Sequence, residues 1–193
     1  MKGKVKRLIA TLAFCCLFIS GYSQAAKLFK TYDDYVKDNF EKFDEVSFKK
    51  GTVIFKSPSK EVKYNADEIW GFIYDNLVFR TNDSKLYMVN TSKTGKIILY
   101  LDGDVQLLVK NGKTVYYVDP AEVYTTYISS GLTGKIFITG FNPMNSKPPK
   151  KYKQGYEDFQ EKHPEHKKFY DCVGDTRKLQ EVMTCLTAYN KAG

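Results

Sequence analysis

The apolar residues between positions 69 and 118 fall into short runs that are separated by turn residues. This pattern is typical of an antiparallel sheet with tight turns between neighbouring strands. Asp75-Asn76 and Asn111-Gly112 are the clearest turn signals, and Asn-Gly favours a two-residue hairpin loop. We therefore predict a hairpin around each turn, the second joining residues 105–110 to 114–118, and further strands over residues 86–89, 96–101 and 135–139.

The first hairpin has a definite register. A two-residue turn at Asp75-Asn76 pairs Tyr74 with Leu77 and Phe72 with Phe79, and directly paired residues share a face. Because side chains alternate along a strand, Trp70 is expected on this same face. Ile69, Ile73 and Val78 make the opposite face apolar too, so both faces should be covered. Trp70 is accordingly interpreted as a core residue and not as a ligand platform.

Two shorter patterns precede this hairpin. After Thr31, which with Asp34 resembles a capping box, apolar residues recur every three or four positions and predict a helix that runs to about Phe43. Residues 46–48 and 52–55 flank Lys49-Lys50-Gly51 and predict another hairpin, ended by a loop over residues 57–60.

The C-terminal third changes character. Residues 119–122 (Asp-Pro-Ala-Glu) read as a helix start, whereas residues 123–128 have strand character, and we favour the strand. A Pro- and Lys-rich linker covers residues 142–153. Helices are predicted over residues 156–162, 164–170 and 176–190. The last helix has an apolar stripe that should pack on the sheet, formed by Leu179, Val182, Met183, Leu186 and Tyr189.

Together these elements predict an α+β fold. We expect an antiparallel β-sheet, curled into a small sandwich or open barrel, with an N-terminal helix and a C-terminal helical segment. The expected organisation is a signal peptide over residues 1–25, a β-rich domain with its N-terminal helix over 26–145, and a basic linker with helices packing on the sheet over 146–193.

The first 25 residues have the properties of a secretory signal peptide. A start with four basic residues precedes an apolar run over residues 8–19, and small residues favour cleavage after Ser23 or Ala25. We expect the mature chain in the periplasm or outside the cell, with no integral membrane segment. An uncleaved anchor and a buried N-terminal helix are the alternatives. Lipidation is not expected, because Phe14 and Cys15 precede the candidate cysteines, where a small residue is required.

Removal of the leader also changes the charge. The whole chain of 193 residues has a formal net charge of +8, but residues 1–23 carry four basic residues and no acid, which leaves +4 for the remainder. That modest excess does not point to nucleic acid. Beyond the leader, Cys172 and Cys185 are the remaining cysteines. A disulfide is favoured in an exported protein, with two free thiols as the alternative. If the last helix began at Asp175, the two cysteines would be too far apart, so a bridge requires a later start.

Candidate catalytic and metal-ligating residues are few. His163 and His166 have a spacing that suits one helical turn, but zinc normally requires three or four such ligands. We therefore interpret them as a solvated loop and helix end, and expect no metal site and no cofactor. Asp102-Gly103-Asp104 is interpreted as a hairpin turn and not as a calcium loop. Ser129-Ser130-Gly131 lacks the Gly-x-Ser-x-Gly pattern of a nucleophile and is interpreted as a turn.

Two further sets of side chains are candidates for catalysis or ligand binding. Asp67 and Glu68 would be the first carboxylates to consider for glycoside hydrolysis, although surface acids at a strand start are the favoured interpretation. The chain has 15 tyrosines, and exposed rings can stack on sugars or peptides. The candidate aromatic binding residues are those on faces expected to be half-exposed, namely Tyr100, Tyr117, Tyr124 and Tyr127.

The Gly-Tyr-Ser-Gln end of the leader resembles those of exported Bacteroidetes proteins. The segments Ile69-Trp70-Gly71-Phe72, Leu86-Tyr87 and Ile97–Tyr100, with a terminal helix ending Tyr189-Asn190, are similar to a loose group of uncharacterised secreted proteins from these bacteria. The resemblance implies export and no enzymatic activity. We expect an exported, non-catalytic binding or structural module of the bacterial envelope, with an envelope protein, peptide or glycan as partner. The alternative is a secreted hydrolase that acts on glycan or peptide through paired carboxylates.

Overall fold

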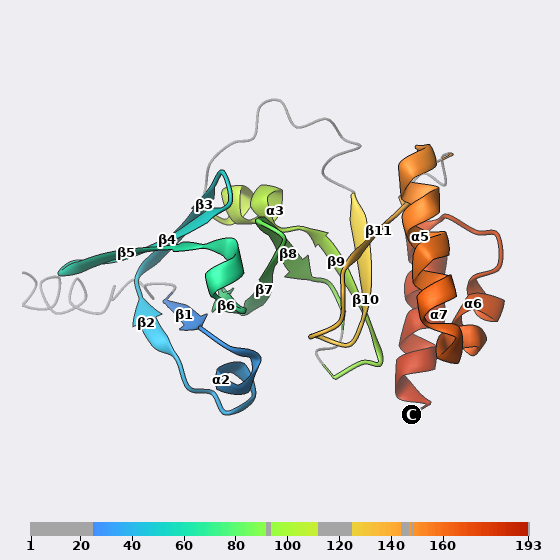
Figure 1. Cartoon of the computed structure of the whole chain (residues 1–193), viewed down its shortest axis with the longest axis horizontal. Coiled ribbons are helices and arrows are strands. Elements are labelled where there is room, and N and C mark those ends of the chain that lie inside the picture. The colour runs from blue at the N-terminus through green and yellow to red at the C-terminus, as the bar shows by residue number, and fades with distance from the viewer. Residues whose placement is uncertain (1–24, 92–93, 112–124, 144–146, 148, 193) are drawn as a thin grey trace, which may run out of the picture.

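The computed structural model describes residues 25–91, 94–111, 125–143, 147 and 149–192 (Figure 1). The predicted leader lies almost entirely outside these residues, as do residues 114–118 and 119–124, for which strands or a helix start were predicted. No helix within the described ranges has both the length and the apolar character needed to cross a membrane.

An eight-stranded sheet forms the centre of the molecule, with strand order β11-β10-β9-β8-β7-β6-β1-β2. All its strand pairings are antiparallel, and β11 and β2 form its two edges, so it does not close into a barrel. Its strands are β1 (Ala26–Phe29), β2 (Glu41–Phe43), β6 (Gly71–Tyr74), β7 (Leu77–Asn82), β8 (Lys85–Val89), β9 (Ile97–Asp102), β10 (Thr126–Ser130) and β11 (Phe137–Thr139).

A second, three-stranded sheet lies at one end of the molecule, and the C-terminal helices lie at the other (Figure 1). The small sheet has the order β3 (Glu45–Lys49), β4 (Thr52–Ser57) and β5 (Lys60–Asn65), followed by the 3₁₀ turn η2 (Ala66–Glu68). The helices are the short α2 (Tyr32–Val36), α3 (Gly103–Lys110), α5 (Lys150–Lys162), α6 (Lys167–Val173) and α7 (Leu179–Lys191). The α+β class with an antiparallel sheet and C-terminal helices is thus confirmed.

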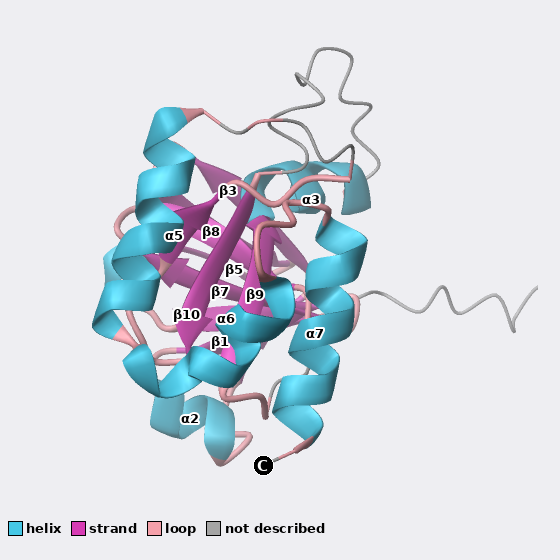
Figure 2. Cartoon of the chain, turned by 90° about the vertical axis from the view of Figure 1, so that its right-hand side faces the viewer, coloured by secondary structure: helices cyan, strands magenta, loops and turns pink. Residues whose placement is uncertain are grey.

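The core has three clusters. The first is buried between β6–β8, the small sheet and α3, and includes Phe72, Phe79 and Leu107. The second lies between β9–β11 and helices α5–α7, and includes Leu99 and Leu186. On β9, Leu99 belongs to the second cluster and Leu101 packs on the first. Residues two apart on a strand share a face, so these two clusters cover one face of the large sheet. Figure 2 shows the C-terminal helices in front of the strands.

The third cluster covers the opposite face and is rich in tyrosine. It contains Val78, Tyr87, Ile98, Tyr100 and Tyr127, each less than 9 % exposed. Burial raises the pKa of Tyr87 to about 12 and also raises the pKa of the Tyr100 and Tyr127 hydroxyls. This face therefore buries polar phenol groups together with aliphatic side chains.

The predicted register of the first hairpin is confirmed, because Tyr74 pairs with Leu77 and Phe72 with Phe79. The predicted face of Trp70 is wrong. Trp70 packs on the third cluster, with its ring 4.3 Å from that of Tyr35, whereas Phe72 lies in the first. Gly71 causes the change: its φ is 159°, and a Cβ there would lie 2.1 Å from the Phe79 carbonyl oxygen. Alternation therefore breaks immediately after Trp70.

The predicted N-terminal helix is too long. The capping box of Thr31 and Asp34 is present, but α2 ends at Val36. Asp38 has a φ of 51°, which stops the helix, and the Asn39 amide donates to a carboxylate oxygen of Asp34 at 2.7 Å. Phe43, expected on the helix, lies on β2. The chain also forms β1 and β5, which the apolar pattern did not indicate, the latter where a loop was expected to begin.

Residues 105–110 form helix α3 and not the predicted strand, and Asp102-Gly103-Asp104 is a helix start and not a hairpin turn. Asp102 Oδ1 accepts hydrogen bonds from the backbone N–H groups of Asp104 at 3.1 Å and Val105 at 3.4 Å. These bonds satisfy two donors of the first turn. The helix packs on β8 and β3 through Leu107, which is 2 % exposed.

Candidate functional site

The turn that joins α5 to α6 carries a cluster of ionisable side chains. It consists of His163, the C-cap of α5, and the 3₁₀ turn η3 (Pro164–His166). Pro164 occupies the first position of η3, where its missing N–H costs nothing. The turn is closed by a hydrogen bond of 2.8 Å from the Tyr170 hydroxyl to the His163 carbonyl oxygen. This local geometry brings both histidines onto one side of the turn.

His166 is buried, with 4 % of its surface exposed. Its Nδ1 lies 2.9 Å from the Tyr189 hydroxyl on α7, and its Nε2 lies 2.9 Å from Ser130 Oγ at the end of β10. Both ring nitrogens are therefore within hydrogen-bond distance of a hydroxyl. The Phe159 ring stacks on the imidazole at 5.9 Å. These partners hold the ring in one orientation.

His163 and Glu165 complete the cluster. Glu165 Oε1 lies 3.0 Å from His163 Nδ1 and 3.7 Å from His166 Nε2. One ligand atom from each of the three residues lies within 4.8 Å of the others. The Glu165 side chain is 57 % exposed and that of His163 is 22 % exposed, so the cluster opens to solvent on one side.

The charges around the cluster act in opposite directions. Burial lowers the pKa of His166, the negative charge of Glu165 opposes this effect, and electrostatic repulsion from Lys96 and from the neighbouring His163 ring lowers the pKa further. A hydrogen bond from its own backbone N–H, and then the His163 ring, lower the pKa of the Glu165 carboxyl. The favoured forms are a neutral His166 and an ionised Glu165.

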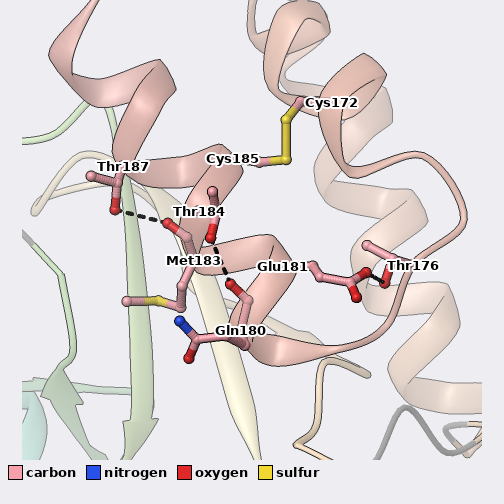
Figure 3. The surroundings of a disulfide bond; sticks show 8 residues. All are labelled: Cys172, Thr176, Gln180, Glu181, Met183, Thr184, Cys185 and Thr187. Carbon is pink, nitrogen blue, oxygen red and sulfur yellow. Dashed lines mark hydrogen bonds between the residues drawn. A yellow bond between two sulfur atoms is a disulfide. The ribbon is translucent and has the colours of Figure 1, made fainter.

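A disulfide cross-links the two helices next to the cluster. Cys172 on α6 and Cys185 on α7 are bonded, with their Cα atoms 5.8 Å apart (Figure 3). α7 begins only at Leu179, the later start that the bridge requires, and the predicted disulfide is confirmed. The bond ties α6 to α7, which carries Tyr189, and α6 directly follows η3, the turn that carries His166.

This arrangement permits two kinds of chemistry. Two imidazoles and a carboxylate form the His₂Glu set that Zn²⁺ takes in three-ligand sites. The Ser130–His166 contact has the spacing of a hydroxyl nucleophile and its base, with Tyr189 at the second ring nitrogen. Tyr189 is a neutral phenol whose pKa is raised by burial and by Glu165, so it supplies no negative charge to the imidazole. The donor set for a metal is therefore the more complete of the two.

Sequence reasoning identified part of this cluster. The expectation that His163 and His166 form a solvated loop and helix end is wrong for His166, which is buried. The interpretation of Ser130 as only a turn residue missed its contact with His166, 36 positions away. The His-x-x-His spacing was the only available signal, because the hydroxyl partners come from distant elements.

Tyr100 and Tyr127 do not form the predicted exposed aromatic platform. Tyr100 is 0 % and Tyr127 is 7 % exposed, so the expectation that their rings are half-exposed is wrong. The two lie directly opposite each other on β9 and β10, where the third core cluster buries both. Tyr117 and Tyr124 lie outside the described residues.

The carboxylates of Asp67 and Glu68 have different hydrogen-bond partners. Asp67 accepts hydrogen bonds from the backbone N–H and hydroxyl of Ser84 at 3.1 and 3.0 Å. Glu68 accepts from the backbone N–H of Asn65 at 2.8 Å and caps η2. Each carboxylate thus stabilises a local turn.

Comparison of the chain with family models, with curated proteins and with solved structures finds no match in any of the three.

Proposed function

We propose that this protein is an exported, non-catalytic binding module of the bacterial envelope, and that one ligand is a divalent transition-metal ion such as Zn²⁺. The observation that carries the proposal is the convergence of His163, Glu165 and His166 on one turn, with their ligand atoms within 4.8 Å of one another. Two nitrogens and a carboxylate oxygen are the donors that Zn²⁺ prefers when cysteine is not used.

Two further features suit a metal ion. Metal-binding histidines usually hydrogen-bond through the second ring nitrogen, which fixes the ring. Tyr189 occupies that position at Nδ1 of His166, and a metal ion at Nε2 would replace the contact of that nitrogen with Ser130 Oγ. The exposed side of Glu165 offers the ion a path from solvent. Three protein ligands leave a fourth position open. Through that position a bound ion can take a donor atom from an envelope protein, peptide or glycan partner.

Export is supported by three observations. The leader has the basic, apolar and small-residue regions of a signal peptide. The Cys172–Cys185 disulfide is typical of an oxidising compartment such as the periplasm. The resemblance to secreted Bacteroidetes proteins points the same way.

Metal binding is tested on EDTA-treated protein that is titrated with ZnCl₂, and with CoCl₂ as a spectroscopic probe. At free Zn²⁺ of about 100 times Kd the folded state gains about 2.7 kcal/mol. For a chain of this size that corresponds to a rise in Tm of roughly 5–10 °C. Visible cobalt absorption should appear over the same range of concentration.

The matched variants are Glu165→Gln and Glu161→Gln. Both remove one exposed carboxylate from the same region, but Glu161 lies outside the cluster. We expect Glu165→Gln to weaken zinc binding by at least about tenfold and Glu161→Gln to leave it unchanged. The absence of a Zn²⁺-dependent Tm shift in the wild-type protein, or equal binding by Glu165→Gln, would refute the metal proposal.

Export is tested separately, by expressing the complete precursor in a Gram-negative host. We expect an extracytoplasmic product whose intact mass places its N-terminus after Ser23 or Ala25. Unprocessed precursor in the cytoplasmic fraction would contradict export and would leave the metal proposal unaffected.

A further inference from the structure

Strand β5 is an outer edge of the three-stranded sheet. It pairs with β4 along one side, and none of the described strands pairs with its other side. An unpaired edge presents a row of backbone N–H and C=O groups that can bond to another strand. β5 projects at the end of the molecule opposite the C-terminal helices (Figure 1). The unpaired edge is therefore remote from the histidine cluster between α5 and α6.

The other sheet edges within the described ranges are covered or short. Helix α3 packs on β3, and the side-chain amide of Asn111 donates to the Val46 carbonyl oxygen on that strand at 3.0 Å. Helix α5 lies so close to β11 that a Cβ on Gly155 would be 2.3 Å from the Ile138 carbonyl oxygen. β2 has only three residues, whereas β5 has six. β5 is thus the edge best suited to pair with a further strand.

Two hydrogen bonds show which backbone groups of β5 point outward. The Ala66 N–H donates to the carbonyl oxygen of Gly51, the residue opposite it in the register of β4 and β5, at 2.8 Å. The Asn65 N–H instead donates to Glu68 at 2.8 Å. Hydrogen-bonded and non-hydrogen-bonded pairs alternate along an antiparallel ladder. The even-numbered residues of β5 therefore direct their backbone groups to β4, and the odd-numbered ones direct theirs to the unpaired edge.

The two outward-pointing residues within β5 have opposite charges. Glu61 and Lys63 lie 3.1 Å apart, with side chains 42 % and 61 % exposed. Val62, between them, faces the other side of the strand and packs on the first core cluster while remaining partly exposed. The edge thus offers an acid and a base on its solvent face and an apolar side chain on its core face.

We propose that β5 pairs antiparallel with β5 of a second copy of this chain, around a two-fold axis at Val62. Glu61 of each copy then lies opposite Lys63 of the other. Each of these two pairs exchanges two N–H···O=C bonds, because both residues point outward. The two small sheets join into one continuous sheet, and the contact is the same for both copies.

Charge selects this register over its neighbours. An axis at Glu61 or at Lys63 also places outward-pointing residues opposite each other, but it brings two carboxylates or two ammonium groups face to face, which is destabilising. The axis at Val62 gives opposite charges at both pairs and brings the two valines together on the core face. Lysine on an edge normally discourages pairing; the adjacent acid makes this edge complementary to itself.

Self-association is measured by sedimentation velocity in EDTA, so that it does not depend on the proposed metal site. Pairing of about five residues from each copy is at the weak end of specific interfaces, so concentrations from micromolar to millimolar are needed. We expect a reversible monomer–dimer equilibrium that weakens as NaCl is added. Protein that stays monomeric throughout, or association that is indifferent to salt, would overturn the proposal.

Charge reversal tests the register. Glu61→Lys and Lys63→Glu each place like charges opposite each other, and each variant alone should dimerise at least about tenfold more weakly. An equimolar mixture of the two should form heterodimers with near wild-type affinity, because every pair is again of opposite charge. Lys168→Glu, on the exposed face of α6, is the matched control and should dimerise as wild type does. Wild-type affinity in either single variant, or a mixture that stays monomeric, would overturn the proposal.

Cross-linking gives a second readout that does not depend on charge. At the axis the two Val62 residues form a non-hydrogen-bonded pair with Cα atoms about 4.5 Å apart, within the range that a disulfide spans. In oxidised glutathione, Val62→Cys should give a covalent dimer on a non-reducing gel. Lys60→Cys, whose position lies away from the axis, should not. Equal cross-linking of both variants, or none with Val62→Cys, would contradict the proposed axis.

Discussion

Removal of the Cys172–Cys185 disulfide should destabilise the protein by an amount that follows from its position in the chain. Cys172 is exposed, whereas Cys185 is 9 % exposed within the second core cluster. Cys172→Ser is therefore the cleanest perturbation, because it places the new hydroxyl in water and leaves a small, weakly polar thiol at position 185. The packing of α6 and α7 on the sheet is otherwise unchanged.

The magnitude comes from the loop that the bond closes. The two cysteines are separated by 13 positions, and loop-closure entropy for such a loop corresponds to about 3 kcal/mol at 25 °C. In a chain of this size each kcal/mol shifts Tm by about 2–4 °C. We expect Cys172→Ser to lower Tm by roughly 6–12 °C.

The assay compares urea unfolding of the wild type, the variant and the wild type in reductant. Reduction should bring the wild type to the stability of the variant, and the variant itself should not respond to reductant. Equal stability of oxidised and reduced wild type would refute the reasoning. So would a loss far above 3 kcal/mol, because the bond would then be required for helix docking and not only for restricting the unfolded chain.

Three other consequences can be measured. Gly71→Ala should prevent or strongly weaken folding, measured as soluble yield and Tm, because its Cβ would lie 2.1 Å from the Phe79 carbonyl oxygen. Burial raises the pKa of Tyr87 and Tyr156 to about 12 from 10.0; the neutral forms stabilise the fold below pH 10, and this stability should be lost as pH rises from 10 to 12. Urea unfolding at several alkaline pH values, with absorbance at 295 nm, tests this, and ordinary tyrosine titration near pH 10 for every ring would contradict it. Asp102→Ala should cost about 1 kcal/mol through loss of the α3 N-cap, and an unchanged urea midpoint would argue against this cap.

Local patterns predicted several elements correctly. The register of β6 and β7 follows from the two-residue turn and the alternation of apolar residues, which involve neighbours in sequence. The apolar stripe of α7 likewise follows from helical spacing, and Val182 and Leu186 are buried as expected. The disulfide could be predicted because only Cys172 and Cys185 lie beyond the predicted leader.

Where the local sequence pattern suited both a helix and a strand, tertiary packing determined the secondary structure. Residues 105–110 are too few to distinguish the two-residue period of a strand from the period of a helix. The segment is helical because α3 packs on β8 and β3 through Leu107 and because Asp102 caps its first turn. The N-terminal apolar stripe suits a helix up to Phe43, but pairing of Ala26 with Phe43 draws that segment into the large sheet. Trp70 changed faces because Gly71 permits a close approach to the neighbouring strand.

The sequence by itself determined the class of the protein: an antiparallel sheet with a C-terminal helical segment that is cross-linked by one disulfide. These features depend on residue type and on spacing within a few positions. Only the tertiary structure brought Ser130 and Tyr189 to His166, and the Tyr100 hydroxyl to Arg80. These contacts depend on how strands and helices far apart in the sequence pack together. The periodicity of apolar residues along one chain does not show which distant side chains come into contact.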